Sequence, residues 1–199
     1  MLPVSDSHVR VSAGFVLLIL WFAVVNGGEL LMIVLNAAAV HELGHWLVLR
    51  CFHAEIRRLR VGILGAVLET DCSRLSYGRE LAAVLAGPAA NLLCASLLSL
   101  FGDKTAVAVG AHLVLGAFNL IPLRPLDGGR ALHLLVAWWL GPWSADLAVR
   151  WTGTVVALCL AGGLCILMHE TGGSLWLLPA AVGALAAAGE EWFGTDHFL

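Results

Sequence analysis

The chain has 199 residues, of which 60% are hydrophobic and 13% charged, and its formal net charge at pH 7 is -3. These fractions, with a mean hydropathy of +0.89, exclude an ordinary soluble globular domain, in which about half of the residues are apolar and about a quarter are charged. No basic run interleaved with aromatic residues indicates a nucleic-acid partner. Composition therefore predicts a single all-α membrane domain over residues 1–199, embedded in the lipid bilayer.

Long apolar runs predict about six transmembrane helices, because about 20 helical residues cross a hydrocarbon core of about 30 Å. The expected spans are Val11–Val25, Leu30–Leu49, Leu81–Phe101, Thr105–Leu123, Trp151–Met168 and Ser174–Ala188. A shorter patch, 131–140, is expected to continue the fourth helix beyond a break or to lie at the membrane interface. The arginines then all fall on one side, with only Lys104 on the other, which predicts that both termini are cytoplasmic.

The second expected span contains the sequence HELGH, residues 41–45. Residues four apart point the same way on a helix, so His41 and His45 can offer two nitrogens to one metal while Glu42 reaches a metal-bound water. Burying these residues in an apolar span costs several kcal/mol unless they are paired or bind a metal. A metal site is therefore favoured over a chance occurrence, and a catalytic zinc would need a third protein ligand elsewhere.

The connection from Cys51 to Gly78 is the one substantial polar segment between spans. Its stretch EIRRLRVGILGAVLET predicts two short strands with Gly62 and Gly65 at a turn, and thus a small cytoplasmic β-hairpin between the second and third spans. Such a hairpin could pair with an extended peptide, or it could only tether the two spans. Both interpretations stay open.

The third and fourth spans each carry a polar residue. In AGPAAN, residues 86–91, the small residues allow close helix approach, so Asn91 is interpreted as an amide that bonds across packed helices, with positioning of a substrate or oxyanion as the alternative. His112 is expected near the outer leaflet and is not predicted to be a ligand.

The segment FNLIPLRPLDGGRAL carries the best candidate for a third ligand, Asp127. Pro122 and Pro125 interrupt helix there, and Gly128 with Gly129 lets the chain turn closely. Non-helical backbone at membrane depth is tolerated where it is buried in protein or lines a water-filled cavity. Asp127 is therefore placed where both a metal and water could be accommodated, although an N-cap of a helix over 128–140 is the alternative.

HELGH in an apolar span, then AGPAAN, then FNLIPLRPLDGGR, together resemble the site-2 protease family of intramembrane zinc metalloproteases. The resemblance is greatest to the branch of the stage IV sporulation protein FB, since no PDZ insertion is recognisable; no CBS domain is expected either. It implies one Zn²⁺ per chain bound by His41, His45 and Asp127, with Glu42 as the catalytic base. It also makes Asn119 and Pro125 candidates for contacts with substrate or with the oxyanion. Arg124 departs from the family pattern, in which an uncharged residue is more usual.

The implied activity is hydrolysis of a peptide bond in a membrane-associated protein substrate, at the cytoplasmic side of a bacterial cell membrane. Zinc would lower the pKa of its water to about 7, and Glu42 would take the proton and pass it to the leaving amine. The resemblance implies regulated intramembrane proteolysis of a sporulation sigma-factor precursor, with inhibitory membrane partners, and an anti-sigma factor is the second choice. The rival interpretations are a metal-binding membrane transporter and a non-proteolytic scaffold.

Overall fold

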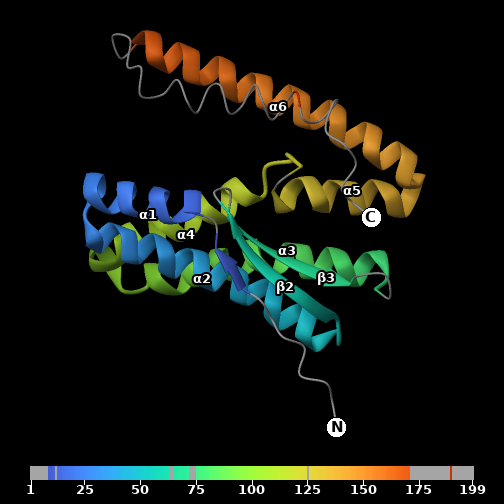
Figure 1. Cartoon of the computed structure of the whole chain (residues 1–199), viewed down its shortest axis with the longest axis horizontal. Helices are drawn as coiled ribbons and strands as arrows, with labels where there is room; N and C mark the ends of the chain where they lie inside the picture. Colours follow the sequence, from blue (N-terminus) through green and yellow to red (C-terminus); the bar gives the residue numbers. More distant parts are fainter. Residues whose placement is uncertain are drawn as a thin grey trace. The chain divides into compact units, whose positions relative to one another are not determined.

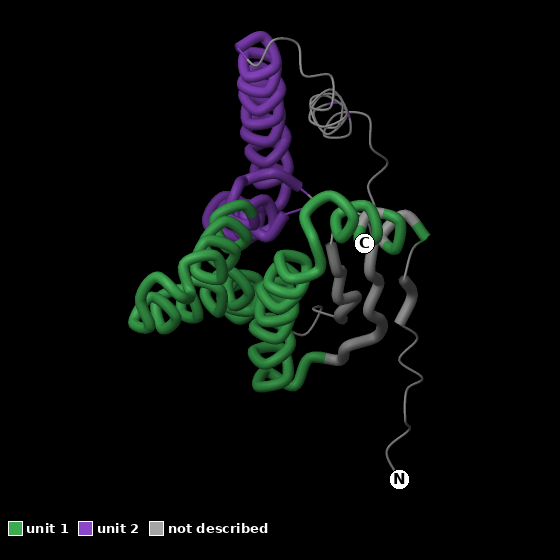
Figure 2. The backbone as a smooth tube through the Cα atoms, turned by 90° about the vertical axis from the view of Figure 1, so that its left-hand side faces the viewer, with its two compact units in different colours: residues 1–118 green, residues 119–199 purple. Residues whose placement is uncertain are grey.

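The computed structural model describes residues 9–11, 13–62, 65–71, 75–124, 126–170 and 189. The chain divides into two compact units, residues 1–118 and 119–199, which we treat one at a time (Figure 2). Figure 1 labels the six α-helices and strands β2 and β3. The described elements are β1 (Val9–Val11), α1 (Ala13–Asn26), α2 (Gly28–Cys51), β2 (Glu55–Gly62), β3 (Gly65–Asp71), α3 (Tyr77–Ser99), the 3₁₀ helix η1 (Gly102–Thr105), α4 (Ala106–Asn119), α5 (Asp127–Leu140) and α6 (Pro142–Glu170).

Three of the described helices, α2, α3 and α6, are long and apolar enough to cross a membrane. Large apolar side chains on their surfaces are exposed, including Leu47, Leu93 and Ile166, as lipid-facing side chains would be. Length, composition and this exposure indicate an integral membrane protein.

The prediction of six spans is not supported by the described helices. Helices α1 and α4 have 14 residues each, about 21 Å of helix, which is shorter than a core of about 30 Å. Both apolar runs are longer than the helices that they predicted. Val11 belongs to strand β1, Thr105 to η1, and α4 ends at Asn119, because Pro122 disfavours helix in the residues just before it. The sixth expected span, Ser174–Ala188, lies outside the described residues.

Three short strands form one sheet in the order β1-β2-β3. Strands β2 and β3 pair antiparallel from Glu55 opposite Asp71 to Gly62 opposite Gly65, with a register shift between Ile56 and Arg58. Strand β1 pairs parallel with β2; it comes from a stretch in which no strand was expected. The connection between α2 and α3 is therefore built mainly of strands, and β1 and β3 are the two edges of the described sheet.

Small residues bring α2 and α3 close together in the first unit. A Cβ atom on Gly44 would lie 2.5 Å from the carbonyl oxygen of Ala86 and 2.8 Å from Cβ of Ala90. On α4, a Cβ atom on Gly116 would lie 3.3 Å from Cβ of Asn91 and 3.4 Å from the carbonyl oxygen of Pro88. These close approaches build a core of small side chains, and the buried polar side chains of this core are His41, Asn91 and His112.

In the second unit, the turn before α5 packs on α5 and α6. Leu123 and Leu126 form a buried cluster with Ala157 of α6, and the Leu126 N–H donates to the Leu123 carbonyl at 2.9 Å. The patch 131–140 is the second part of α5, a helix of its own that is separated from α4 by residues 120–126. α5 begins at Asp127 with Leu126 in the N-cap position, so Asp127 is the first helical residue rather than the cap.

Candidate metal centre

The two histidines of HELGH lie on the same face of α2, and their Nε2 atoms are 3.1 Å apart. The imidazole planes are inclined by 80°, and His41 is 5% exposed. Two zinc–nitrogen bonds of about 2.0–2.1 Å in tetrahedral geometry place their nitrogens about 3.3 Å apart. The separation of the two Nε2 atoms is close to that value, so both can be ligands of a single ion.

A backbone carbonyl fixes the orientation of His45. Its Nδ1 atom lies 2.8 Å from the carbonyl oxygen of Ala83 on α3. A carbonyl oxygen only accepts hydrogen bonds, so the proton of the neutral imidazole is on Nδ1 and the lone pair is on Nε2. This is the tautomer that a metal-binding histidine needs.

Gly87 on α3 provides the space that the His45 ring occupies. A Cβ atom at this position would collide with Nε2 of His45, and it would lie 2.6 Å from Cε1 of the same ring. Only glycine therefore allows His45 to keep its position beside His41. The sequence indicated Gly87 as a packing residue, and the structure adds that what it packs against is a candidate ligand.

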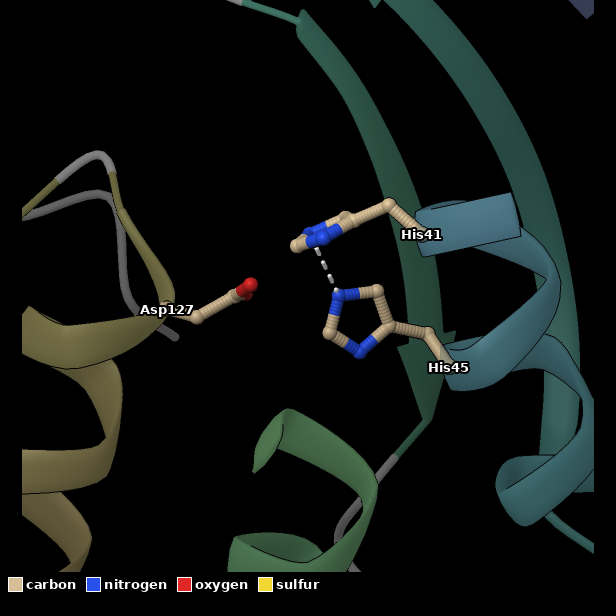
Figure 3. A group of neighbouring side chains, drawn as sticks. All are labelled: His41, His45 and Asp127. Carbon is tan, nitrogen blue, oxygen red and sulfur yellow. Dashed lines mark hydrogen bonds between the residues drawn. The ribbon is translucent and has the colours of Figure 1, made fainter. Parts of the chain in front are cut away.

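Asp127 provides the third potential ligand atom. One nitrogen of each histidine and one carboxylate oxygen of Asp127 all lie within 4.8 Å of one another (Figure 3). His41 is buried, and His45 and Asp127 are partly buried. Two imidazoles and a carboxylate match the donor set of catalytic zinc sites, which leave a fourth position for water. The chemistry of these three side chains therefore fits zinc.

Comparisons with known proteins agree with this chemistry, although no family model matches the chain. A protein of Synechocystis with a zinc metalloprotease designation is 29% identical over 115 residues, which are 53% of this chain and 30% of that protein. A zinc metalloprotease of Methanocaldococcus jannaschii is 25% identical over 62% of this chain and 40% of its own length. The chain thus spans less than half of the length of these curated relatives.

Among solved structures, a site-2 protease from Methanocaldococcus jannaschii matches with a TM-score of 0.69 at 20% identity, and the match covers 100% of this chain and 97% of that chain. The chain has the fold of a site-2 protease. Together with the relatives, this fold supports the site-2 protease family, whereas the sporulation branch is not confirmed.

For three other predicted site residues, the structure gives at most the position in the fold and the degree of burial. Glu42 follows His41 on α2 and is partly buried. Asn119 is the last residue of α4 and is also partly buried, and Pro125 lies outside the described residues. Their expected roles, as base and as contacts of substrate or oxyanion, stay predictions.

The structure shows the partners of two polar residues, Asn91, which was predicted to bond across packed helices, and His112. Asn91 is in hydrogen-bonding distance of His41 and of His112, so His112, which was not predicted to be a ligand, is connected to the candidate ligand His41 through Asn91. A signal was available: two buried polar side chains in neighbouring apolar helices of a membrane protein usually need each other as partners.

Arg124, whose role was open, belongs to a small charged cluster of the second unit. Its Nη2 atom lies 3.9 Å from Oδ1 of Asp146 on α6, and Nε2 of His133 on α5 lies 3.1 Å from the same oxygen. Asp146 therefore connects the turn before Asp127 to α5 and α6. Because its side chain is 51% exposed, the ion pair is expected to be weak.

Proposed function

We propose that this chain is an intramembrane zinc metalloprotease, a hydrolase that cuts a peptide bond of a membrane-associated protein. The observation that carries the proposal is the pair of histidines on an apolar helix, with their Nε2 atoms 3.1 Å apart. The carboxylate oxygen of Asp127 within 4.8 Å supplies the third donor. The designations of the relatives and the site-2 protease fold support the same activity.

In this mechanism His41, His45 and Asp127 would hold one zinc ion per chain. The chemistry supplied by a bound zinc would be Lewis-acid polarisation of the scissile carbonyl and acidification of water near neutral pH. Glu42 is the catalytic base: it accepts a proton from the attacking water and then donates it to the leaving amine nitrogen. Asn119 and Pro125 are our candidates for contacts that position the substrate or stabilise the oxyanion.

We place the site toward the cytoplasmic side of a bacterial cell membrane, with both termini cytoplasmic and no PDZ or CBS domain within residues 1–199. The distribution of arginines against Lys104 supports this orientation. A substrate helix must unwind before it is cut, since its own hydrogen bonds protect the scissile bond. The edges at β1 and β3 offer an unwound segment a strand to pair with.

The proposed substrate is a sporulation sigma-factor precursor, released by regulated intramembrane proteolysis and restrained by inhibitory membrane partners. The motifs that resemble the sporulation protein FB branch support this choice. A membrane-tethered anti-sigma factor is the second candidate.

The decisive experiment expresses the chain together with each candidate substrate and measures cleavage and bound zinc. Replacing Glu42→Gln should retain zinc and slow cleavage by about 10²–10⁴-fold, because only the proton transfer is removed. His41→Ala should lose both zinc and cleavage. Glu29→Gln is the matched control, since Glu29 is an exposed glutamate in the first turn of the same helix.

Two results would overturn the proposal. Zinc transport that persists in Glu42→Gln, without proteolysis by the wild type, would establish a metal-binding transporter. Zinc binding with neither transport nor proteolysis would point to a non-proteolytic scaffold.

A further inference from the structure

The polar core of the first unit extends from His41 through two more helices. Nδ1 of His41 lies 3.2 Å from the amide nitrogen of Asn91 on α3, and Oδ1 of Asn91 lies 3.0 Å from Nδ1 of His112 on α4. Asn91 is 0% exposed and His112 is 1% exposed. The three side chains form one continuous hydrogen-bonded row, which we call the His41–Asn91–His112 relay.

The chemistry of the amide makes the relay directional. An amide oxygen only accepts and an amide nitrogen only donates, and the two ends of an asparagine side chain have nearly the same shape. When the nitrogen faces His41, Nδ1 of His41 accepts and its ring proton is on Nε2. When the oxygen faces His41, Nδ1 donates and Nε2 has a free lone pair.

Only the second arrangement is compatible with a metal on Nε2 of His41, the atom that lies beside Nε2 of His45. We propose that Asn91 and His112 are positioning residues for His41, an inference that rests on the zinc protease function proposed above. In the metal-binding state, Nδ1–H of His41 donates to Oδ1 of Asn91, and the Asn91 amide donates to Nδ1 of His112. This state exchanges the two ends of the amide relative to the distances given above, and it requires the ring proton of His112 on Nε2, so that Nδ1 accepts from the amide and keeps the amide oxygen toward His41.

Packing around Asn91 supports a fixed relay. A Cβ atom on Gly116 would lie 3.3 Å from Cβ of Asn91, so the backbone of α4 packs closely against the first side-chain atom of Asn91. Both ends of the amide have a histidine nitrogen within 3.2 Å. Because a buried amide group without a hydrogen-bond partner is unfavourable, the two hydrogen bonds favour orientations in which both histidines are paired.

The test measures zinc affinity of the purified full chain in detergent by competition with a chelator, and the ligand geometry by the absorption spectrum of the cobalt(II) form. Asn91→Leu removes the acceptor for His41 and should weaken zinc binding by about 10–100-fold, as is usual for partners of metal-binding histidines. Asn91→Asp keeps an oxygen toward His41 and should recover most of this loss. Asn36→Leu, the same change at an exposed position of α2, should leave affinity and spectrum unchanged.

A pure packing role for Asn91 gives the opposite order. Asn91→Asp would then be at least as harmful as Asn91→Leu, because it buries a charge and removes the donor to His112. An Asn91→Asp protein that binds zinc as weakly as Asn91→Leu would overturn the proposal.

His112 provides an independent pair of variants. If Asn91→Leu does not fold, this pair alone tests whether the relay positions His41. His112→Leu should weaken zinc binding by about 10-fold and alter the cobalt spectrum, whereas His112→Gln, whose side-chain oxygen can accept from Asn91, should restore both. Wild-type affinity in folded His112→Leu would overturn the relay while leaving the zinc protease proposal intact. A wild-type chain without zinc affinity would overturn both.

Discussion

The two regions that provide the candidate ligands are built in different ways. In the first unit, His41 and His45 are on a long helix, and both rings are held from outside by the neighbouring helix α3, through the Ala83 carbonyl, Asn91 and the space at Gly87. In the second unit, Asp127 begins α5 directly after a turn, and what holds this position is mainly backbone. Cβ atoms on Gly128 and Gly129 would collide with the carbonyl oxygens of Leu120 and Leu123.

This difference predicts how each region should respond to mutation. A histidine ring can rotate away without disturbing its helix, so the first region should lose metal binding before it loses its fold. The path of the turn before Asp127 is set by close backbone contacts, so the second region should lose stability together with metal binding.

Gly87→Ala should have the largest effect on zinc binding with little effect on the fold. The new Cβ atom would collide with the His45 ring, and a side chain can move where a backbone cannot. Since a ligand itself is displaced, we expect a loss of zinc affinity of at least about 100-fold, the upper end of the range for outer partners. Chelator competition checks the affinity, and thermal unfolding of the zinc-free protein checks the fold.

The control for Gly87→Ala is Gly110→Ala on α4, where a Cβ atom would meet nothing within 4 Å. That change should be neutral or stabilising by up to about 1 kcal/mol. Equal zinc binding by Gly87→Ala and wild type would mean that His45 does not need its observed position.

Gly128→Ala should have the opposite effect to Gly87→Ala, because it should lower the stability of the protein before it lowers zinc affinity. The new Cβ atom would collide with the backbone carbonyl of Leu120, so the turn or the first turn of α5 must shift. Such overpacking typically destabilises by about 1–3 kcal/mol, which corresponds to a fall in Tm of several degrees. Thermal unfolding with and without zinc measures it, and Gly163→Ala on α6, an open position, is the control. A Gly128→Ala protein that lost only zinc would remove the contrast between the regions.

Local periodicity explains how much of this could be predicted from the sequence. The common face of His41 and His45 follows from a spacing of four on a helix, and it is what α2 presents. The break between α4 and α5 follows from Pro122, whereas Gly128 and Gly129, which were expected at a turn, lie in the first turn of α5. Features of this kind depend on a few consecutive residues.

Features that depend on packing between helices could not be predicted in the same way. That Asn91 faces His41 on one side and His112 on the other depends on how α2, α3 and α4 cross, and no single apolar run contains that information. For the fourth expected span, the prediction failed for a related reason. Hydrophobicity does not show where a helix ends, and the apolar run Thr105–Leu123 continues past Asn119, the last residue of α4.

The smallest expected effect is that of Asp146→Asn, which weakens the charged cluster behind the Asp127 turn. Asp146 faces Arg124 at 3.9 Å and His133 at 3.1 Å, but its side chain is 51% exposed, so water already screens both contacts. We expect a destabilisation of about 0.2–1 kcal/mol, or a fall in Tm of about 0.4–4 °C, that shrinks at high salt. Asp103→Asn, at an exposed position of η1, is the matched control. A fall as large as that of Gly128→Ala would show that charge, and not only backbone packing, holds the turn, and the contrast between the two regions would then need a different explanation.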